Sequence, residues 1–226
     1  MLKTRITELF GIEHPILGGC MQWITGPRFT AAVSNAGALG IMSSAMFPTQ
    51  EEFRAALREL KRLTDRPFAV NLNLFPALRP LDNDLYIEVM LEEGGVGIVE
   101  TSGHRPPEEL PARLKENGIL LMHKCTSVRH ALTAQAMGYD VVTVFGSEGG
   151  GHIGEAGLTF LSMVPRAVEV LRVPVVAAGC IADGRGLAAA LALGAQGALI
   201  GTRLLLSEEC PIHAGLKQRL LAAGET

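Results

Sequence analysis

The sequence predicts one α/β domain over residues 1–226, folded as a (β/α)8 TIM barrel. Eight short apolar segments alternate with amphipathic segments of helical character along the whole chain. Each apolar segment is typical of a strand that is buried on both faces, as in a parallel sheet covered by helices. The length of 226 residues accommodates eight such units. An open doubly wound sheet is the alternative, although it would usually use fewer strands in this length.

The expected strands and helices follow one another in a regular order. Strands are expected at 14–19, 38–44, 68–74, 96–102, 119–124, 141–146, 173–179 and 197–203, with helices between them that include 49–63, 126–138 and 184–194. Thr49 and Glu52 form a capping-box signature at the start of a helix. Gly118, Gly138 and Gly194 stand where helices should end. A final helix within "PIHAGLKQRLLAAG" is expected to close the eighth unit.

Composition and charge exclude several classes of function. Hydrophobic residues make up 48% of the chain and charged residues 19%, which is typical of a globular protein with a well-buried core. The formal net charge is −3 and Lys and Arg are scattered, so the sequence predicts neither a nucleic-acid surface nor a membrane surface. The four cysteines are far apart, without a CxxC pair, and the N-terminal segment lacks a secretory apolar region. We therefore expect free thiols and a cytoplasmic protein.

Glycine-rich turns after the last two expected strands indicate a phosphate site. The segment "AAGCIADG" places Gly179 at the turn after the seventh strand, and Gly201 and Thr202 follow the eighth strand. In barrels of this kind, the loops after strands seven and eight frequently hold a phosphate group through backbone N–H groups. The alternative is that these glycines only form tight turns. Because both loops carry the pattern, phosphate binding is the favoured interpretation.

Three polar residues at other strand ends are candidates for contacts with a ligand. Lys124 ends the fifth strand after apolar residues, where it would meet an anionic ligand at the barrel mouth or simply reach solvent. Asn71 and Asn73 alternate along the third strand and therefore face the same way. Their amides would bind the edge of a heteroaromatic ligand, or else form a hydrogen-bonded layer inside the barrel.

One histidine follows three consecutive glycines after the sixth strand. The segment "SEGGGHIGE" presents His152, and histidine titrates near neutral pH, so the pattern favours a functional group over a structural one. Met21 and Gln22 precede the single tryptophan after the first strand, where Met and Trp would flank a flat ring or pack against the N-terminal segment. His123 and His130 have no partner spacing for zinc, and we expect no metal.

Several segments together resemble one known family. They are "KTRITELFGIEHPI", "DRPFAVNLNL", "HKCTSVRHA", "EGGGHIG" and "IADGRGLAAALALGAQGALIGTRLL", and they resemble the nitronate monooxygenase (2-nitropropane dioxygenase) family of FMN-dependent barrels. The resemblance runs over essentially the whole chain. It implies bound FMN, with the phosphate on the loops after strands seven and eight. The cofactor-binding residues that it implies are Cys20, Met21, Gln22, Asn71, Asn73, Lys124, Gly150, Ala178, Gly179, Cys180, Gly201 and Thr202.

The resemblance also implies a reaction. The cofactor performs the redox chemistry, and the protein orients it and tunes its electronics. Lys124 near the pyrimidine end would stabilise negative charge there, and His152 would take a proton from a neutral nitroalkane or hold the nitronate anion. The implied activity is oxidation of alkyl nitronates with dioxygen to carbonyl compounds and nitrite. Related branches leave alternatives open: an NAD(P)H:quinone reductase, a flavin-dependent enoyl-acyl-carrier-protein reductase, or a flavin-binding barrel without catalysis.

Three features depart from the family pattern. Cys20 and Cys180 stand where the family usually has glycine, and a side chain at position 180 would be strained if the backbone there has positive φ. Gly18 stands where glutamine is common. Family members usually continue into helices that cover the active site, so we expect a barrel that lacks most of this lid. An uncovered mouth would offer a partner surface, and a homodimer is one expectation.

Overall fold

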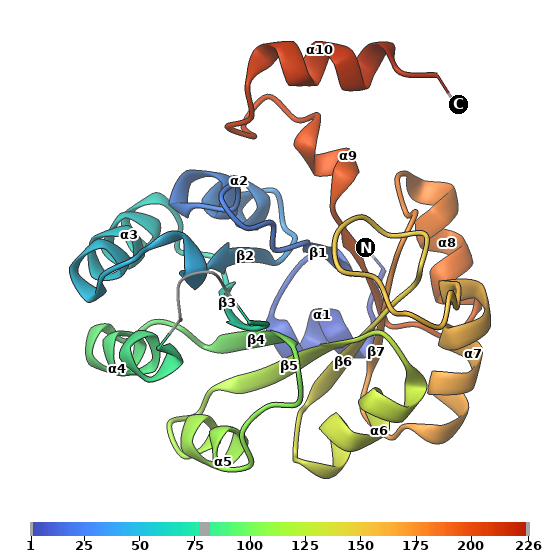
Figure 1. Ribbon diagram of the computed structural model, residues 1–226, viewed down its shortest axis with the longest axis horizontal. Helices are drawn as coiled ribbons and strands as arrows, with labels where there is room; N and C mark the ends of the chain where they lie inside the picture. The colour runs from blue at the N-terminus through green and yellow to red at the C-terminus, as the bar shows by residue number, and fades with distance from the viewer. Residues whose placement is uncertain (1, 77–81, 225–226) are drawn as a thin grey trace.

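The computed structural model describes residues 2–76 and 82–224, which form a barrel of eight parallel strands (Figure 1). The strands are β1 (Ile16–Gly18), β2 (Gly40–Ser43), β3 (Phe68–Leu74), β4 (Ile98–Gly103), β5 (Leu120–Cys125), β6 (Val141–Phe145), β7 (Val175–Ala178) and β8 (Gly197–Ile200). Neighbouring strands pair in sequence from β2 to β8, and β8 pairs with β1. A parallel bridge between Leu17 and Leu39 closes the ring, and the N–H of Gly18 donates to the carbonyl of Leu39 at 2.8 Å. The predicted (β/α)8 barrel is confirmed.

Helices cover the outside of the barrel, as Figure 1 shows for α2 to α8. The helices are α1 (Arg5–Phe10), α2 (Pro27–Asn35), the 3-10 helix η1 (Ser44–Met46), α3 (Gln50–Leu63), α4 (Asn83–Glu93), α5 (Leu110–Lys115), α6 (Val128–Ala136), α7 (Phe160–Val170), α8 (Gly184–Ala192), α9 (Thr202–Leu205) and α10 (Ala214–Ala222). The capping box that starts α3 is confirmed, because Thr49 Oγ1 accepts from the N–H of Glu52 at 3.2 Å and Glu52 Oε2 accepts from the N–H of Thr49 at 3.3 Å. No helix in the described ranges is long and apolar enough to cross a membrane.

The glycines expected to end helices do so in the left-handed region of backbone conformation. Gly118, Gly138 and Gly194 have φ values of +73°, +94° and +97°. L-residues with a side chain rarely adopt these angles, so each position favours glycine and stops the preceding helix. Most of the observed strands are shorter than the predicted ones. The apolar sequence continues past the strand ends because the first residues of the adjoining loops are also buried.

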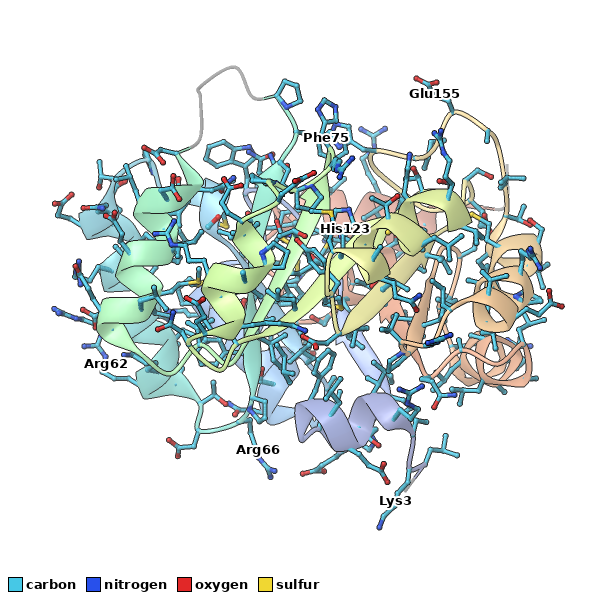
Figure 2. All side chains as sticks on the ribbon, turned by 90° about the horizontal axis from the view of Figure 1, so that it is seen from below. Lys3, Arg62, Arg66, Phe75, His123 and Glu155 are labelled. Atoms are coloured by element: carbon cyan, nitrogen blue, oxygen red, sulfur yellow. The ribbon has the colours of Figure 1, made fainter. Side chains whose placement is uncertain are left out.

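Apolar side chains fill both the barrel and the layer between barrel and helices. Inside the barrel, side chains such as Leu17, Ile41, Ile98 and Met122 form one buried cluster. A separate cluster lies between the strands and the surrounding helices. α1 lies across one end of the barrel (Figures 1 and 2), and its Ile6 belongs to the interior cluster with 0% of its surface exposed. The carboxyl ends of the strands therefore form the open end, which is where barrel enzymes place their sites.

The prediction that the final helix closes the eighth unit is wrong. α9 has only four residues, and α10 has no buried residue. Figure 1 shows α10 beyond the ring of helices, away from the strands. The connecting segment instead buries Cys210 in a small cluster with Phe29 and Val33 of α2. Because the segment is anchored there, α10 does not return to the outer face of β8.

Candidate active site

The interior of the barrel changes from apolar to polar at one level. Ile41, Ala69, Ile98, Met122 and Val141 all point into the interior cluster. Side chains two residues further along a strand point to the same side. The residues two positions on are Ser43, Asn71, Glu100, Lys124 and Thr143, and the strand register pairs Ser43 with Asn71, Asn71 with Glu100, and Lys124 with Thr143. Five neighbouring strands therefore place a polar layer just inside the open end.

Glu100 is a site residue that the local sequence pattern does not reveal, because it stands inside an apolar strand. Its side chain is fully buried. Glu100 Oε2 accepts a hydrogen bond from Asn71 Nδ2 at 2.6 Å and lies 3.6 Å from Lys124 Nζ. Asn71 Nδ2 also donates to Ser102 Oγ at 3.1 Å. Asn71 and Lys124 are thus brought together, around a carboxylate.

Two buried oxygen atoms of this layer have no hydrogen-bond partner among the described residues. They are Glu100 Oε1 and Thr143 Oγ1. Leaving a buried polar atom unpaired costs about 1–3 kcal/mol, and more for a charged group. A native interior retains such atoms where a water, an ion or a bound ligand supplies the missing partner, or where the group has a catalytic role. The polar layer therefore has the character of a binding surface.

Cys20 lies beside this layer, after β1. Thr25 Oγ1 donates to Cys20 Sγ at 3.7 Å. Burial, followed by the nearby charge of Glu100, raises the pKa of the Cys20 thiol to about 11. The thiol is consequently neutral at physiological pH and acts as a small buried group rather than as a nucleophile.

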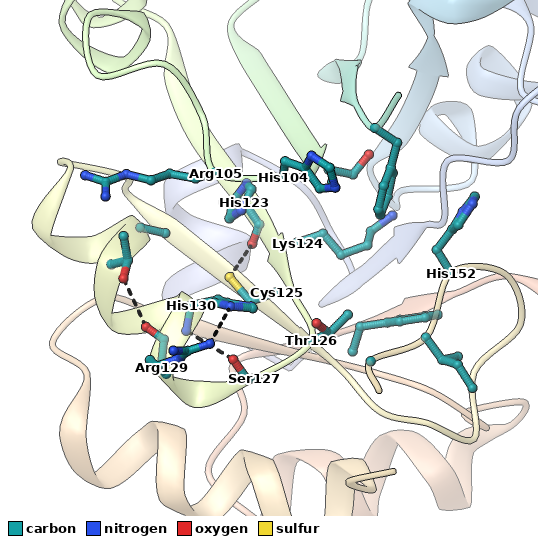
Figure 3. Close-up of a pocket in the computed structure, with 18 of the residues that line it drawn as sticks. His104, Arg105, His123, Lys124, Cys125, Thr126, Ser127, Arg129, His130 and His152 are labelled. Carbon is teal, nitrogen blue, oxygen red and sulfur yellow. Dashed lines mark hydrogen bonds between the residues drawn. The ribbon is translucent and has the colours of Figure 1, made fainter. Parts of the chain in front are cut away.

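His152 lies over the open end on the loop after β6. Its ring stacks on Phe75 with centroids 4.5 Å apart and an angle of 23° between the planes. Phe75 follows β3, so the stack joins loops from two separate strands across the mouth. His152 is exposed, and Figure 3 shows it on the same side of a cavity as Lys124. The imidazole is held in place and remains accessible.

The rest of this loop is anchored by Glu148. Its Oε1 accepts a hydrogen bond from the N–H of Phe160 at 2.9 Å, at the first residue of α7. Its neighbour Gly146 has no room for a side chain, because a Cβ there would lie 2.3 Å from Glu148 Oε2. Gly150, by contrast, is exposed, and a Cβ there would meet no atom of the described residues within 4 Å. Gly149 packs against the ring of Phe145, where a Cβ would lie 2.5 Å from the ring, whereas Gly150 and Gly151 leave open space beside His152.

The loops after β7 and β8 lie side by side, since Ala178 pairs with Leu199 at the ends of the two strands. Gly179 has φ +120°, and Cys180 has φ +51°, which is the left-handed conformation that disfavours a side chain. Within the described part of the chain, the backbone N–H groups of Gly179, Cys180 and Gly201 donate no hydrogen bond to another backbone group. Gly201 also borders open space, because a Cβ there would meet none of the described atoms within 4 Å. Together these N–H groups form a cradle suited to an anion.

The remaining predicted residues lie around the mouth without joining the polar layer. Asn73 Oδ1 accepts from the N–H of Phe75 at 3.1 Å and so shapes its own loop. Met21 is half-buried and packs on the small cluster under α2, while Gln22 is exposed. Ala178 is buried in the interior cluster and Thr202 is exposed at the start of α9.

His123 is a buried histidine next to Lys124 on β5. Its Nδ1 lies 2.7 Å from Thr101 Oγ1, which in turn donates to the Tyr139 hydroxyl at 2.9 Å. Burial lowers the pKa of His123 to about 4, so the imidazole is neutral at physiological pH. No group of His, Cys, Asp or Glu side chains in the described ranges is arranged to hold a metal ion.

A cavity of about 820 Å³ opens beside the polar layer, over the ends of β4 and β5 (Figure 3). Lys124, His152 and Phe75 are among the residues that line it. Arg105 and Arg129 line the end away from His152, as Figure 3 shows. This volume falls in the range of sites that hold drug-sized molecules or cofactors, about 300–1,000 Å³.

Comparison with known proteins identifies the family. The nitronate monooxygenase family model matches residues 3–226. The chain belongs to this family. It is 42% identical over 224 residues to the (3aS,4S,5R,7aS)-5-hydroxy-7a-methyl-1-oxo-octahydro-1H-indene-4-carboxyl-CoA dehydrogenase of Mycobacterium tuberculosis, covering 99% of this chain and 61% of that relative. It is 33% identical to a probable nitronate monooxygenase of Staphylococcus saprophyticus, covering 100% of this chain and 74% of that relative.

The chain is also similar to a solved structure. The chain superposes on FabK from Thermotoga maritima with a TM-score of 0.90 and 40% sequence identity, covering 99% of this chain and 69% of that one. The chain thus spans about three fifths of the length of the CoA dehydrogenase that it matches, at 61%. The matched region covers 99% of this chain in both comparisons, so it spans the whole barrel.

Proposed function

We propose that the chain is the barrel of an FMN-dependent oxidoreductase. The observation that carries the proposal is the buried polar layer at the open end of the barrel, where Glu100 Oε1 and Thr143 Oγ1 have no hydrogen-bond partner among the residues that the structure describes. A flavin ring has a polar edge of alternating N–H and carbonyl groups, which is the chemistry that a carboxylate, an amide and an ammonium group would recognise. The unpaired atoms favour a ligand of that kind over a purely structural layer.

The residues present fit both ends of FMN. The cradle formed by the N–H groups of Gly179, Cys180 and Gly201 would hold the phosphate. Asn71, Lys124 and Glu100 would contact the polar edge of the ring. When bound, FMN would accept electrons from the substrate and pass them to dioxygen or another acceptor.

The role assigned to His152 is to move a proton. A C–H bond next to a nitro group is acidic, and an accessible imidazole is a suitable general base for it. The stack on Phe75 fixes the orientation of the ring, so its nitrogen atoms meet a substrate in one geometry. After proton transfer, the imidazolium would hold the nitronate anion by a charge-assisted hydrogen bond. Nitronate oxidation to a carbonyl compound and nitrite is the reaction that family membership favours.

Oxidoreduction of an acyl-CoA thioester is the second candidate. Two observations favour it: the 42% identity to a carboxyl-CoA dehydrogenase, and a cavity of about 820 Å³ that greatly exceeds the size of a small nitroalkane. A C–H bond next to a thioester carbonyl is also acidic, so the same base would serve. The two candidates share the FMN site and differ in what the cavity holds.

An anaerobic absorbance titration of the FMN-loaded protein tests this proposal. Bleaching of the flavin by propyl nitronate supports the first candidate, and bleaching only by an acyl-CoA thioester supports the second. Bleaching by NADH alone would instead indicate a reductase of the quinone or enoyl-thioester type. Failure to bind FMN at all would overturn the proposal.

A variant of the polar layer tests the FMN site independently of turnover. Glu100→Gln removes the buried carboxylate while preserving its shape, and we expect the dissociation constant of FMN to change by about tenfold, which corresponds to one charged hydrogen bond. Glu51→Gln, at an exposed position of α3, is the control and should leave the constant unchanged. Equal FMN affinity in both variants would remove Glu100 from the site.

A further inference from the structure

We infer that the end of the cavity away from His152 binds the phosphorylated adenosine end of a coenzyme A thioester. The inference rests on the second candidate under the proposed function and assigns the part of the cavity that the flavin site does not use. This end of the cavity would recognise the coenzyme A part of the thioester, whereas the polar layer and His152 act on the acyl group.

The charges that line the cavity favour an anion. Among the described residues, its lining includes the cations Lys124, Arg105 and Arg129 and one carboxylate, that of Glu155. Within the described part of the chain, Arg129 has no carboxylate oxygen within 4.0 Å. Exposed cations that converge on one cavity raise the local concentration of anionic ligands and strengthen phosphate binding.

Arg105 and Arg129 approach this end from different elements. Arg105 follows β4, and Arg129 lies in the first turn of α6. Arg105 Nη2 contacts Glu108 at 2.9 Å, but both side chains are mostly exposed, at 63% and 82%, so this pair is weak and easily exchanged for a phosphate. Figure 3 shows the two arginines flanking the same end of the cavity. Two separate guanidinium groups suit a ligand with more than one phosphate.

His123 adds a hydrogen-bonding group to the wall of the cavity. His123 lines the cavity with only 4% of its surface exposed. Its Nδ1 is occupied by Thr101 Oγ1 at 2.7 Å, and its Nε2 has no partner among the described residues. The Thr101 hydroxyl donates to Tyr139 and accepts from Nδ1 of the neutral ring, which leaves Nε2 to accept one hydrogen bond from a bound molecule.

The other walls of the cavity suit the rest of the molecule. Phe75, Phe145 and Pro106 line it with apolar surface, and His104 packs edge-on against Phe75 with ring centroids 5.7 Å apart. Aromatic and aliphatic walls of this kind accommodate an adenine ring or the largely apolar arm of coenzyme A. The cavity continues to Lys124 and His152, so a thioester bound along it would present its acyl group at the polar layer.

The inference is tested by calorimetric binding of free coenzyme A to the FMN-loaded protein, at low and physiological ionic strength. We expect binding that weakens as salt rises, and a loss of about tenfold or more when Arg105→Glu and Arg129→Glu are combined. The matched control is Arg166→Glu on α7, because Arg166 forms the same type of exposed i,i+3 pair with Glu169 at 3.1 Å but lies outside the cavity. All three positions are exposed, so the variants should fold normally.

NADPH shares the adenosine phosphate chemistry and is measured in parallel. Binding of NADPH but not of coenzyme A, with the same dependence on the two arginines, would overturn the thioester assignment and give the cavity to a dinucleotide. Binding of coenzyme A that is unaffected by the double variant would place the ligand elsewhere on the protein. If neither ligand binds while FMN is retained, the inference fails and the proposed oxidoreductase site stands.

Discussion

At the N-terminal end of the barrel, α1 lies across the strands, and its Ile6 and Phe10 are only 0% and 3% exposed. At the opposite end, the described residues leave Glu100 Oε1 and Thr143 Oγ1 buried without partners, and Cys180 holds a left-handed backbone conformation. Burial of apolar surface at the first end stabilises the folded state, whereas the unpaired buried groups at the second end destabilise it. The contrast indicates that folding stability resides near α1 and that binding capacity resides at the polar layer.

The largest effect is expected from His152 at the open end. His152→Ala should leave FMN bound but slow the oxidation of a neutral nitroalkane by about 10²–10⁴-fold, since a general base contributes that much. Supplying the preformed nitronate should restore most of the rate, because no proton then has to be removed. Nitrite release measures both reactions. His14→Ala, an exposed histidine near α1, is the control, and equal rates in both variants would deny His152 this role.

The closed end is expected to respond in stability rather than in binding. Phe10→Ala should lower the free energy of unfolding by about 3–5 kcal/mol, because it empties a buried site. Leu9→Ala on the same helix is the control, since Leu9 is 37% exposed, and its cost should be far smaller. Urea unfolding of both variants measures the difference. Similar losses from the two variants would show that burial of α1 against the barrel is not what stabilises this end.

A pH-dependent loss of stability is expected from His123, between the two ends. Its folded-state pKa is about 4, against 6.5 for an ordinary histidine, so the unfolded chain binds the proton first as the pH falls. The stability from this group is present above pH 6.5 and is lost on acidification towards pH 4, by about 3 kcal/mol.

His123→Gln isolates this contribution, because glutamine keeps a polar group near Thr101 but does not titrate. We expect a shallower fall in the free energy of unfolding between pH 6.5 and 4 than in the unmodified protein. His14→Gln at an exposed position should retain the steeper fall. Parallel curves for His123→Gln and the unmodified chain would contradict the assignment of the acid sensitivity to this buried imidazole.

The sequence predicts the barrel well because each parallel strand is buried on both faces and therefore appears as a continuous apolar run. It predicts the polar layer only in part. Asn71 and Lys124 stand out locally, but the partner of Asn71 is Glu100, 29 residues away on the next strand. Likewise, the placement of α10 depends on the burial of Cys210 against α2, and the local hydrophobic pattern around Cys210 does not predict that contact. Contacts between distant strands and loops are what the local pattern leaves undetermined.

The smallest effect is expected at Cys180, whose backbone strain is one of the two costs attributed to the open end. A side chain at φ +51° costs about 1–2 kcal/mol, and glycine would relieve this strain while losing some of the gain to greater freedom in the unfolded chain. Cys180→Gly should therefore raise the free energy of unfolding by about 1 kcal/mol or less. This corresponds to a rise in Tm of at most about 2–4 °C. Cys180→Ala removes the thiol but keeps the Cβ and the strain, so it should give no rise. If both variants behave alike, the loop is not strained, and the cost attributed to the open end falls on the unpaired atoms of the polar layer alone.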